Sequence, residues 1–194
     1  MKVEIEQLKK VAAKILVNLG EEKDNADIVS EIMVWADMRR VVTHGTYLLT
    51  PIFKRAKANM IKIPTQIKTI KDNRGTSVLD GGNGLGQVAA YKAMTTSIKK
   101  AKDFGLAITL VRNTNNIGSL AYYSRMAANE GMIGITMTNA APAIAPWGGT
   151  EAFMGTNPFS VGIPTFNQNP LIADMSSSVV ARGKESRRRI PMKP

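Results

Sequence analysis

The spacing of apolar residues changes at Pro64, and this change constrains the fold of the chain more than any other feature. Before Pro64, apolar residues recur every three or four positions, which predicts helices. After Pro64, short apolar runs typical of strands alternate with helical segments. A helical N-terminal part followed by strand–helix alternation indicates an α/β or mixed α+β fold. The predicted helices span residues 5–19, 25–36, 46–59, 88–104 and 120–130, and the predicted strands span residues 66–70, 77–80, 106–111, 132–138, 159–163 and 171–173.

Particular residues mark the ends of the N-terminal helices. Gly20 follows the first helix as a stop signal, and Asp24 or Asn25 is expected to cap the second. Pro51 either lies in the first turn of the third helix or breaks it. Pro64 ends the helical region.

The composition excludes several kinds of protein. The chain has no cysteine, which rules out a disulfide scaffold, a thiolate metal site and a cysteine nucleophile. Its first residues are charged and helical, unlike a signal peptide. No stretch approaches the roughly 18 consecutive apolar residues that a membrane span requires. A cytoplasmic protein without a membrane-spanning segment is therefore expected.

The chain carries a formal net charge of +11. Residues 182–194 contribute six basic residues and one acidic residue, so much of the positive charge lies at this end of the chain. A positive surface attracts anionic small molecules and, more weakly, nucleic acid. The aromatic residues do not alternate with the basic ones, as a stacking platform for single strands would need. Nucleic-acid binding is therefore not expected as the main function.

His44 is the only histidine of the chain, and it lies between Thr43 and Gly45 just after the second predicted helix. Imidazole is the one side chain here whose ordinary pKa suits proton transfer near neutral pH. His44 is thus the candidate for general acid–base catalysis, with a structural or merely exposed histidine as the alternative. One histidine without a carboxylate cluster cannot fill a metal coordination shell, so no metal is expected.

Polar and glycine-rich loops follow several predicted strands. Residues 80–87 (DGGNGLGQ) join a strand to a helix, the setting of a dinucleotide fingerprint, but the glycine spacing does not match it. A tight structural turn is the favoured interpretation, and a phosphate loop is the alternative. Residues 112–118 (RNTNNIG) also follow a strand, where α/β folds bind ligands, and can equally be a polar turn.

Six short segments occur along the chain in a definite order. They are THG at 43–45, LDGGNGLG at 79–86, RNTNNIG at 112–118, MTNAAPAIAPWGG at 137–149, GTNP at 155–158 and ADMSSSVVARGK at 173–184. Together they resemble the malate/L-lactate dehydrogenase family of oxidoreductases. The similarity runs from near the N-terminus to Lys184 and is marked toward the diketogulonate reductase and ureidoglycolate dehydrogenase branches.

This resemblance implies NAD(P)-dependent hydride transfer between a 2-hydroxy acid and a 2-oxo acid, in a homodimer. It implies a helical region over residues 1–64, a partial cofactor-binding domain of mixed-sheet, non-Rossmann fold over residues 65–184, and a basic tail unlike the family over residues 185–194. His44 matches the family's proton donor or acceptor, Thr43 its serine neighbour, and Asn116 a second catalytic position. The residues that match the cofactor site are Ala140, Pro170, Leu171, Ile172, Ala173, Asp174, Met175 and Ser176.

The sequence also departs from the family pattern. Leu48 stands where the family has an arginine, Asn116 where it has a histidine, and Arg40 where it has a glycine. A leucine cannot clamp a carboxylate, and an asparagine cannot shuttle a proton. Family members are also longer, so the chain is expected to be truncated. Three hypotheses follow: an active 2-oxo-acid reductase, a truncated or degenerate inactive member, and, least favoured, a basic nucleic-acid-binding module.

Overall fold

The computed structural model describes residues 3–166 and 169–178. It confirms the mixed α/β fold. The helices are α1 (Ile5–Asn18), α2 (Lys23–Met38), α3 (Leu49–Lys57), α4 (Gly86–Phe104) and α5 (Leu120–Asn129), with 3-10 turns at Val42–His44 and Thr46–Leu48. The strands are β1 (Lys68–Asp72), β2 (Thr76–Asp80), β3 (Ile108–Arg112), β4 (Gly134–Met137), β5 (Phe159–Ile163) and β6 (Leu171–Met175). The basic tail lies outside the described residues.

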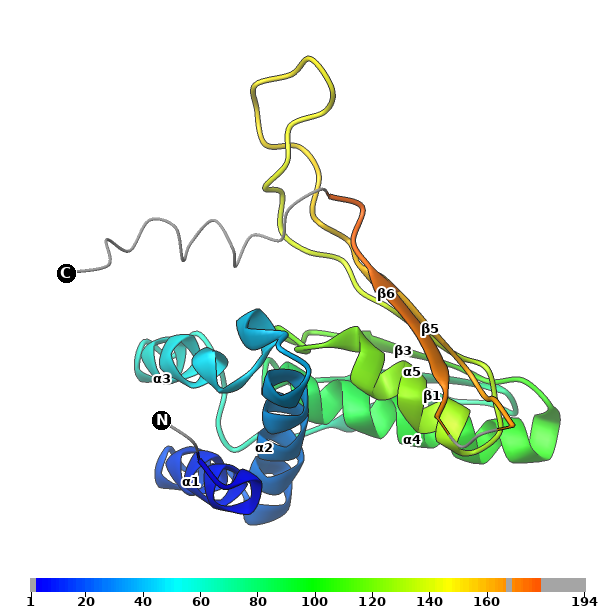
Figure 1. Cartoon of the computed structure of the whole chain (residues 1–194), viewed down its shortest axis with the longest axis horizontal. Helices are drawn as coiled ribbons and strands as arrows, with labels where there is room; N and C mark the ends of the chain where they lie inside the picture. Colours follow the sequence, from blue (N-terminus) through cyan, green and yellow to red (C-terminus); the bar gives the residue numbers. More distant parts are fainter. Residues whose placement is uncertain (1–2, 167–168, 179–194) are drawn as a thin grey trace.

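The strands form two three-stranded sheets. In the first sheet, β2 pairs antiparallel with β1 and parallel with β3, so the sheet is mixed as expected. The second sheet, β4-β5-β6, is entirely antiparallel. Helix α4 packs on β2 and β3, helix α5 packs on the second sheet, and the two helices contact each other between the sheets (Figure 1). The helical N-terminal part joins this stack through α2, which contacts both α4 and α5.

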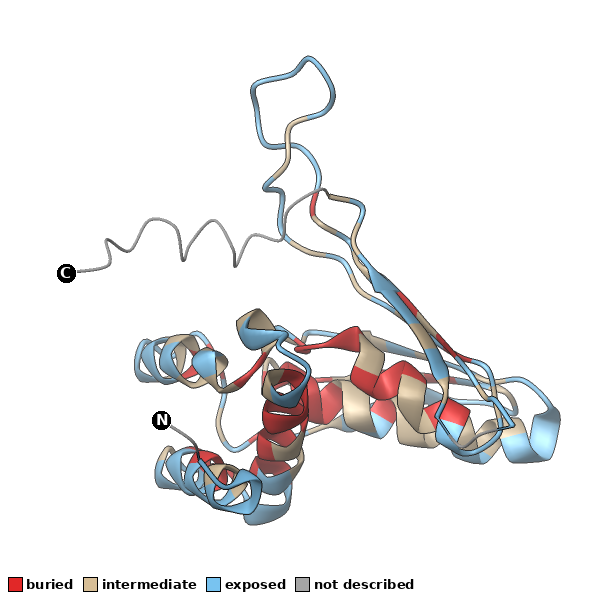
Figure 2. Cartoon of the chain, viewed as in Figure 1, coloured by how far each residue is buried: buried red, intermediate tan, exposed pale blue. Residues whose placement is uncertain are grey.

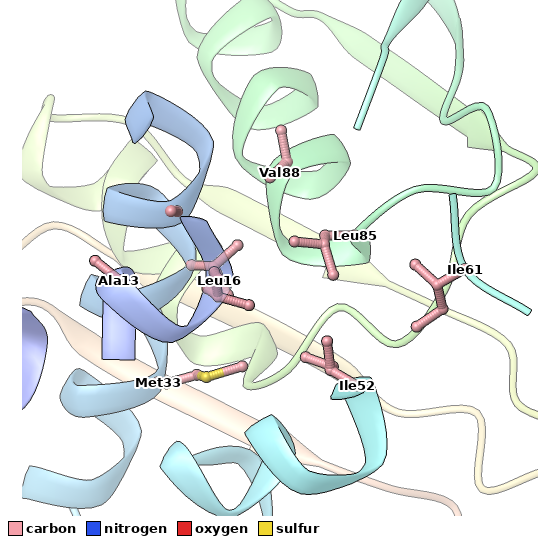
Figure 3. Packing of buried hydrophobic residues seen from close by; sticks show 9 residues of the cluster. Ala13, Leu16, Met33, Ile52, Ile61, Leu85 and Val88 are labelled. Atoms are coloured by element: carbon pink, nitrogen blue, oxygen red, sulfur yellow. The ribbon is translucent and has the colours of Figure 1, made fainter. Parts of the chain in front are cut away.

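The core is concentrated where α2 meets the other helices, and Figure 2 shows the buried residues gathered there. One cluster joins the N-terminal helices to the start of α4 and includes Leu16, Met33, Ile52, Leu85 and Val88 (Figure 3). A second cluster joins α2 to α5. Its buried members are Ile32, Trp35, Ala36, Ile117, Leu120, Tyr122 and Tyr123.

A buried carboxylate links the helical part to the first sheet. The Glu21 side chain accepts hydrogen bonds from the Thr65 backbone N–H, the Thr65 hydroxyl and the Asn25 amide. The expected capping of α2 by Asp24 or Asn25 is therefore wrong: the N-cap is Glu22, and Asn25 is committed to this buried network. Satisfying a buried carboxylate outweighs the local capping preference, because an unpaired one would destabilise the fold strongly.

The second sheet turns one face to α5 and leaves the other open. Gly134 and Gly162 lie beside α5, and a Cβ at either position would come within 2.5 Å of the Ser124 carbonyl oxygen. The helix and the sheet therefore approach closely. Strand register places only apolar side chains on the opposite face, here called the outer face: Ile135, Met137, Phe159, Val161, Ile163, Leu171, Ala173 and Met175.

Two further features concern the surface. Residues 138–158, which connect β4 to β5, form an arm that projects from the body of the molecule (Figure 1). In the described part of the chain, no helix has the length and apolar character needed to cross a membrane.

Candidate active site

A cavity of about 1110 Å³ lies between the end of α2, the start of α5 and strand β6. Its volume slightly exceeds the usual range of about 300–1,000 Å³ for small-ligand pockets, so it is large enough for a cofactor. The cavity brings together residues that are far apart in the sequence and that the sequence analysis singled out. Among the lining residues are Thr43, His44, Pro170, Ile172, Asp174, Met175 and Ser176.

The turn after α2 fixes the position of His44. The chain reverses at Arg40, whose φ of 60° is in the left-handed region that favours glycine, which accounts for the glycine of the family pattern. Asp37 then holds the next turn, because its carboxylate accepts hydrogen bonds from the Thr46 N–H and hydroxyl at 2.9 and 2.7 Å. A Cβ at Gly45 would lie 1.8 Å from that carboxylate. The T-H-G segment thus requires its glycine.

His44 is half-buried, and its Nδ1 lies 3.0 Å from the Thr43 hydroxyl. Burial lowers the pKa of His44 below its ordinary value of 6.5, and the negative charge of Asp174 opposes this shift only in part. The imidazole is therefore mainly neutral at pH 7. With Nδ1 engaged by Thr43, Nε2 is the nitrogen available for proton transfer.

Asp174 sits at the N-terminus of α5. Ser119 holds the N-cap position without a side-chain hydrogen bond to the helix, and Asp174 Oδ2 instead accepts the Ala121 backbone N–H at 3.0 Å. Burial raises the pKa of Asp174, while the Ala121 N–H, His44 and the Ser119 hydroxyl act in the opposite direction. The helix terminus thus supplies part of the compensation for a partly buried carboxylate.

Strand alternation divides the predicted cofactor residues. Successive side chains of a strand point to opposite faces, so Pro170, Ile172 and Asp174 face the cavity. Leu171 and Ala173 lie on the outer face instead and do not line the cavity. Met175, the last residue of β6, also lies on the outer face by strand register but still borders the cavity. The family resemblance assigned all of residues 170–176 to the cofactor site. It therefore could not separate the residues that face the cavity from those on the outer face.

Two other predicted residues also lie outside the cavity lining. The Asn116 side chain accepts the Gly118 N–H at 2.8 Å and so closes a turn just before α5. The Ala140 N–H donates to Asn157 Oδ1 at 3.0 Å within the projecting arm. Leu48, which stands in place of an arginine, packs against the first hydrophobic cluster.

The glycine-rich turn at residues 80–87 is held by the loop after β3. The Asn115 amide donates to the carbonyl oxygens of Asn83 and Gly84, both at 2.9 Å. At Gly86, a Cβ would lie 2.2 Å from the Asn115 carbonyl oxygen. These glycines allow close backbone approach, and none of residues 80–87 lines the large cavity. The geometry supports the structural interpretation of the turn.

Sequence reasoning missed much of the cavity lining, including its two arginines and the tryptophan beside them: Trp35, Arg39 and Arg125. The Arg39 guanidinium lies 3.9 Å from the centroid of the Trp35 ring, and that of Arg125 lies 5.3 Å from the same centroid. Trp35 and Arg39 are four residues apart on α2, a spacing that places them on one face of a helix. That spacing is the only sequence signal that could have paired Trp35 with Arg39. No such signal exists for Arg125, because its position over Trp35 depends on how α5 packs against α2.

Comparisons with known proteins agree with this geometry. Residues 3–189 match the family model described as malate/L-lactate dehydrogenase. The malate dehydrogenase of Pyrococcus horikoshii is 42% identical over 171 residues, which cover 88% of this chain and 47% of the relative. The ureidoglycolate dehydrogenase (NAD(+)) of Escherichia coli K12 is 30% identical over 184 residues, which cover 95% of this chain and 53% of the relative.

A solved structure is similarly close. The sulfolactate dehydrogenase of Methanocaldococcus jannaschii superposes with a TM-score of 0.89 at 38% identity, covering 97% of this chain and 55% of the other. The chain thus spans about half the length of the relatives it matches. With a family model that matches almost its whole length, the chain belongs to the malate/L-lactate dehydrogenase family.

Proposed function

We propose that the chain is the part of an NAD(P)-dependent oxidoreductase that carries the proton-transfer histidine for interconverting a 2-hydroxy acid and a 2-oxo acid. The observation that carries this proposal is the shared cavity of His44 and Asp174, on segments 130 residues apart in sequence. Relatives named as malate, sulfolactate and ureidoglycolate dehydrogenases support the reaction class.

The neutral state of the His44 imidazole suits the oxidation of the hydroxy acid, in which a base must accept the hydroxyl proton. A bound nicotinamide supplies the hydride chemistry. During oxidation of the hydroxy acid, neutral His44 would accept the hydroxyl proton at Nε2, and in the reverse direction the imidazolium would return that proton to the carbonyl oxygen of the oxo acid. Thr43 holds the ring through Nδ1. Asn116 acts in this proposal as a positioning residue, since its side chain holds the turn that leads into α5.

The cavity has chemistry that fits a dinucleotide. Of the two Asp174 oxygens, Oδ1 receives no hydrogen bond from the described residues, and a free carboxylate oxygen can accept from a ribose hydroxyl. Pro170, Ile172, Met175 and Ser176 would line the rest of that site. Leu171, Ala173 and Ala140 would contribute through the backbone or through packing. The use of NAD or NADP as the cofactor, the homodimer and the cytoplasmic location stay predictions.

A second candidate is a degenerate member without turnover, which the packing of Leu48 into the core favours. Binding and activity assays separate the two. Stabilisation by NADH or NADPH in a thermal shift is expected for either if the cofactor site is intact, by mass action. Oxidation of L-malate, L-lactate or L-sulfolactate, seen as reduced cofactor formed, is expected only for the active enzyme.

The His44→Gln variant tests the role of the histidine. Glutamine keeps a hydrogen-bonding side chain but cannot transfer a proton, so turnover should fall by about 10²–10⁴-fold while cofactor binding is retained. Lys92→Gln, at an exposed position of α4 outside the cavity lining, is a matched control that should leave turnover intact. Unchanged turnover in His44→Gln would remove the histidine from the mechanism, and absence of cofactor binding by the unaltered chain would reject the proposed function.

A further inference from the structure

The guanidinium groups of two cavity arginines lie over the same aromatic ring, that of Trp35. The Arg39 guanidinium stacks over Trp35 from the last turn of α2, and Arg125 lies over Trp35 and over Tyr122, 5.7 Å from the Tyr122 centroid, from the middle of α5. Trp35 and Tyr122 meet edge to face with centroids 5.4 Å apart. Such stacking holds the plane of a guanidinium and leaves its N–H edge for another partner.

Neither guanidinium is paired with an acid among the described residues. Arg39 donates only to the Trp35 carbonyl oxygen, at 3.4 Å, and the buried Nε of Arg125 has no hydrogen-bond partner there. The ion pairs of this part of the chain involve other cations. Burial and the like charge of Arg125 both lower the pKa of Arg39. Two cations held near each other without an anion are unfavourable, and a bound anion would relieve the repulsion.

The pair opens onto the cavity that holds His44 and Asp174. We propose that Arg39 and Arg125 form an oxyanion subsite that binds a phosphate or carboxylate group of the ligand. This inference rests on the proposed function for the identity of the ligand. The same chemistry is present in the phosphates of a dinucleotide and in the carboxylate of a 2-oxo acid. Two planar guanidiniums suit either oxyanion by paired hydrogen bonds, and they supply the positive charge that Leu48 does not.

Binding measurements on matched variants test the subsite. The variants are Arg39→Gln, Arg125→Gln, the double variant, and the double lysine variant Arg39→Lys/Arg125→Lys, which keeps the charge but loses the planar fork. Arg74→Gln, at an exposed position in the turn between β1 and β2, removes one charge away from the cavity and is the control. Circular dichroism and the unfolding midpoint of each variant show that it is folded.

Isothermal titration with NADH, NADPH and L-malate, each added alone, identifies the source of the oxyanion. The glutamine double variant should lose roughly tenfold to a hundredfold in affinity for one of them, as expected for losing hydrogen bonds between charged groups, and the lysine variant should lose less. A loss confined to the dinucleotides assigns the subsite to phosphate, and a loss confined to malate assigns it to carboxylate. Equal affinities in the original chain and the double variant would overturn the inference while leaving the proposed function intact.

Inorganic pyrophosphate distinguishes a failure of the proposed function from a failure of the oxyanion subsite. If the unaltered chain binds neither dinucleotide nor malate, the proposed function fails, and pyrophosphate then probes the subsite directly. A pyrophosphate-dependent rise in unfolding temperature that the double variant loses would uphold the subsite. No rise in the unaltered chain, or the same rise in the double variant, would reject it.

Discussion

At the scale of single residues, His44 and Asp174 interact electrostatically across the cavity. Burial favours the neutral form of each side chain. The pKa of His44 is lowered and that of Asp174 is raised, so burial is the dominant cause in each case. A histidine kept neutral is in the protonation state that can accept a proton. In the proposed reaction, a neutral His44 would therefore suit oxidation of the alcohol at neutral pH better than the reverse direction.

Because the chain has one histidine, its titration can be followed without ambiguity by NMR of the imidazole. We expect His44 to titrate below 6.5, and Asp174→Asn to lower this pKa further, because the carboxylate is the group that raises it. Asp27→Asn, whose native carboxylate pairs with Lys23 on the surface, is the control and should have no effect. An unchanged or higher pKa in Asp174→Asn would contradict the assigned coupling.

The same shifts predict how stability depends on pH. The folded-state pKa of His44 is below that of the unfolded chain, so its contribution is full above about 6.5 and is lost as the pH falls through the folded-state value. Asp174, with its raised pKa, contributes in the opposite sense: its contribution is present below 3.8 and lost as the pH rises through the folded-state value.

At the scale of elements, the sequence predicted most helices and strands because their apolar spacing is regular. The third helix is an instructive exception: a 3-10 turn occupies Thr46–Leu48, and α3 begins only at Leu49, with Pro51 in its first turn. The fixed φ of proline is tolerated there. The resemblance located His44 and Asp174, but the arginine subsite depends on α2 and α5 packing together, which no local pattern encodes.

The close approach of α5 to the second sheet gives a prediction about Gly162. In Gly162→Ala the new methyl would lie 2.5 Å from the Ser124 backbone oxygen, so helix and strand must separate. We expect a destabilisation of about 1–3 kcal/mol, typical of overpacking, in chemical denaturation. Ala173→Val, which adds methyl groups to the open outer face on the neighbouring strand, is the control and should be nearly neutral. Equal stability of Gly162→Ala and the original chain would show that this packing is looser than described.

At the scale of the whole molecule, the outer face of the second sheet is an apolar surface exposed to solvent. Ile135, Met137 and Leu171 are 54%, 71% and 64% exposed, and the face carries no polar side chain. A continuous apolar surface of this kind is typical of an interface. Phe159, Ile163 and Met175 on the same face are also exposed, so the face is open to solvent.

We therefore expect the chain on its own to bind a hydrophobic dye and to self-associate as its concentration rises, measured by sedimentation velocity. The double variant Ile135→Glu/Leu171→Glu should reduce both, because two charges on the face oppose its burial. Leu106→Glu, an exposed position just before β3, is the matched control. Association that survives the double variant would mean that another surface is responsible.

The two tryptophans lie in opposite surroundings, Trp35 beneath the cavity arginines and Trp147 fully exposed on the projecting arm. Their fluorescence should therefore separate into a blue-shifted emission shielded from soluble quenchers and a red-shifted emission open to them. Trp147→Phe would leave Trp35, beside the cavity, as the single tryptophan of the chain. Energy transfer from that indole to a reduced nicotinamide would then report occupancy of the cavity directly, with no label attached to the protein.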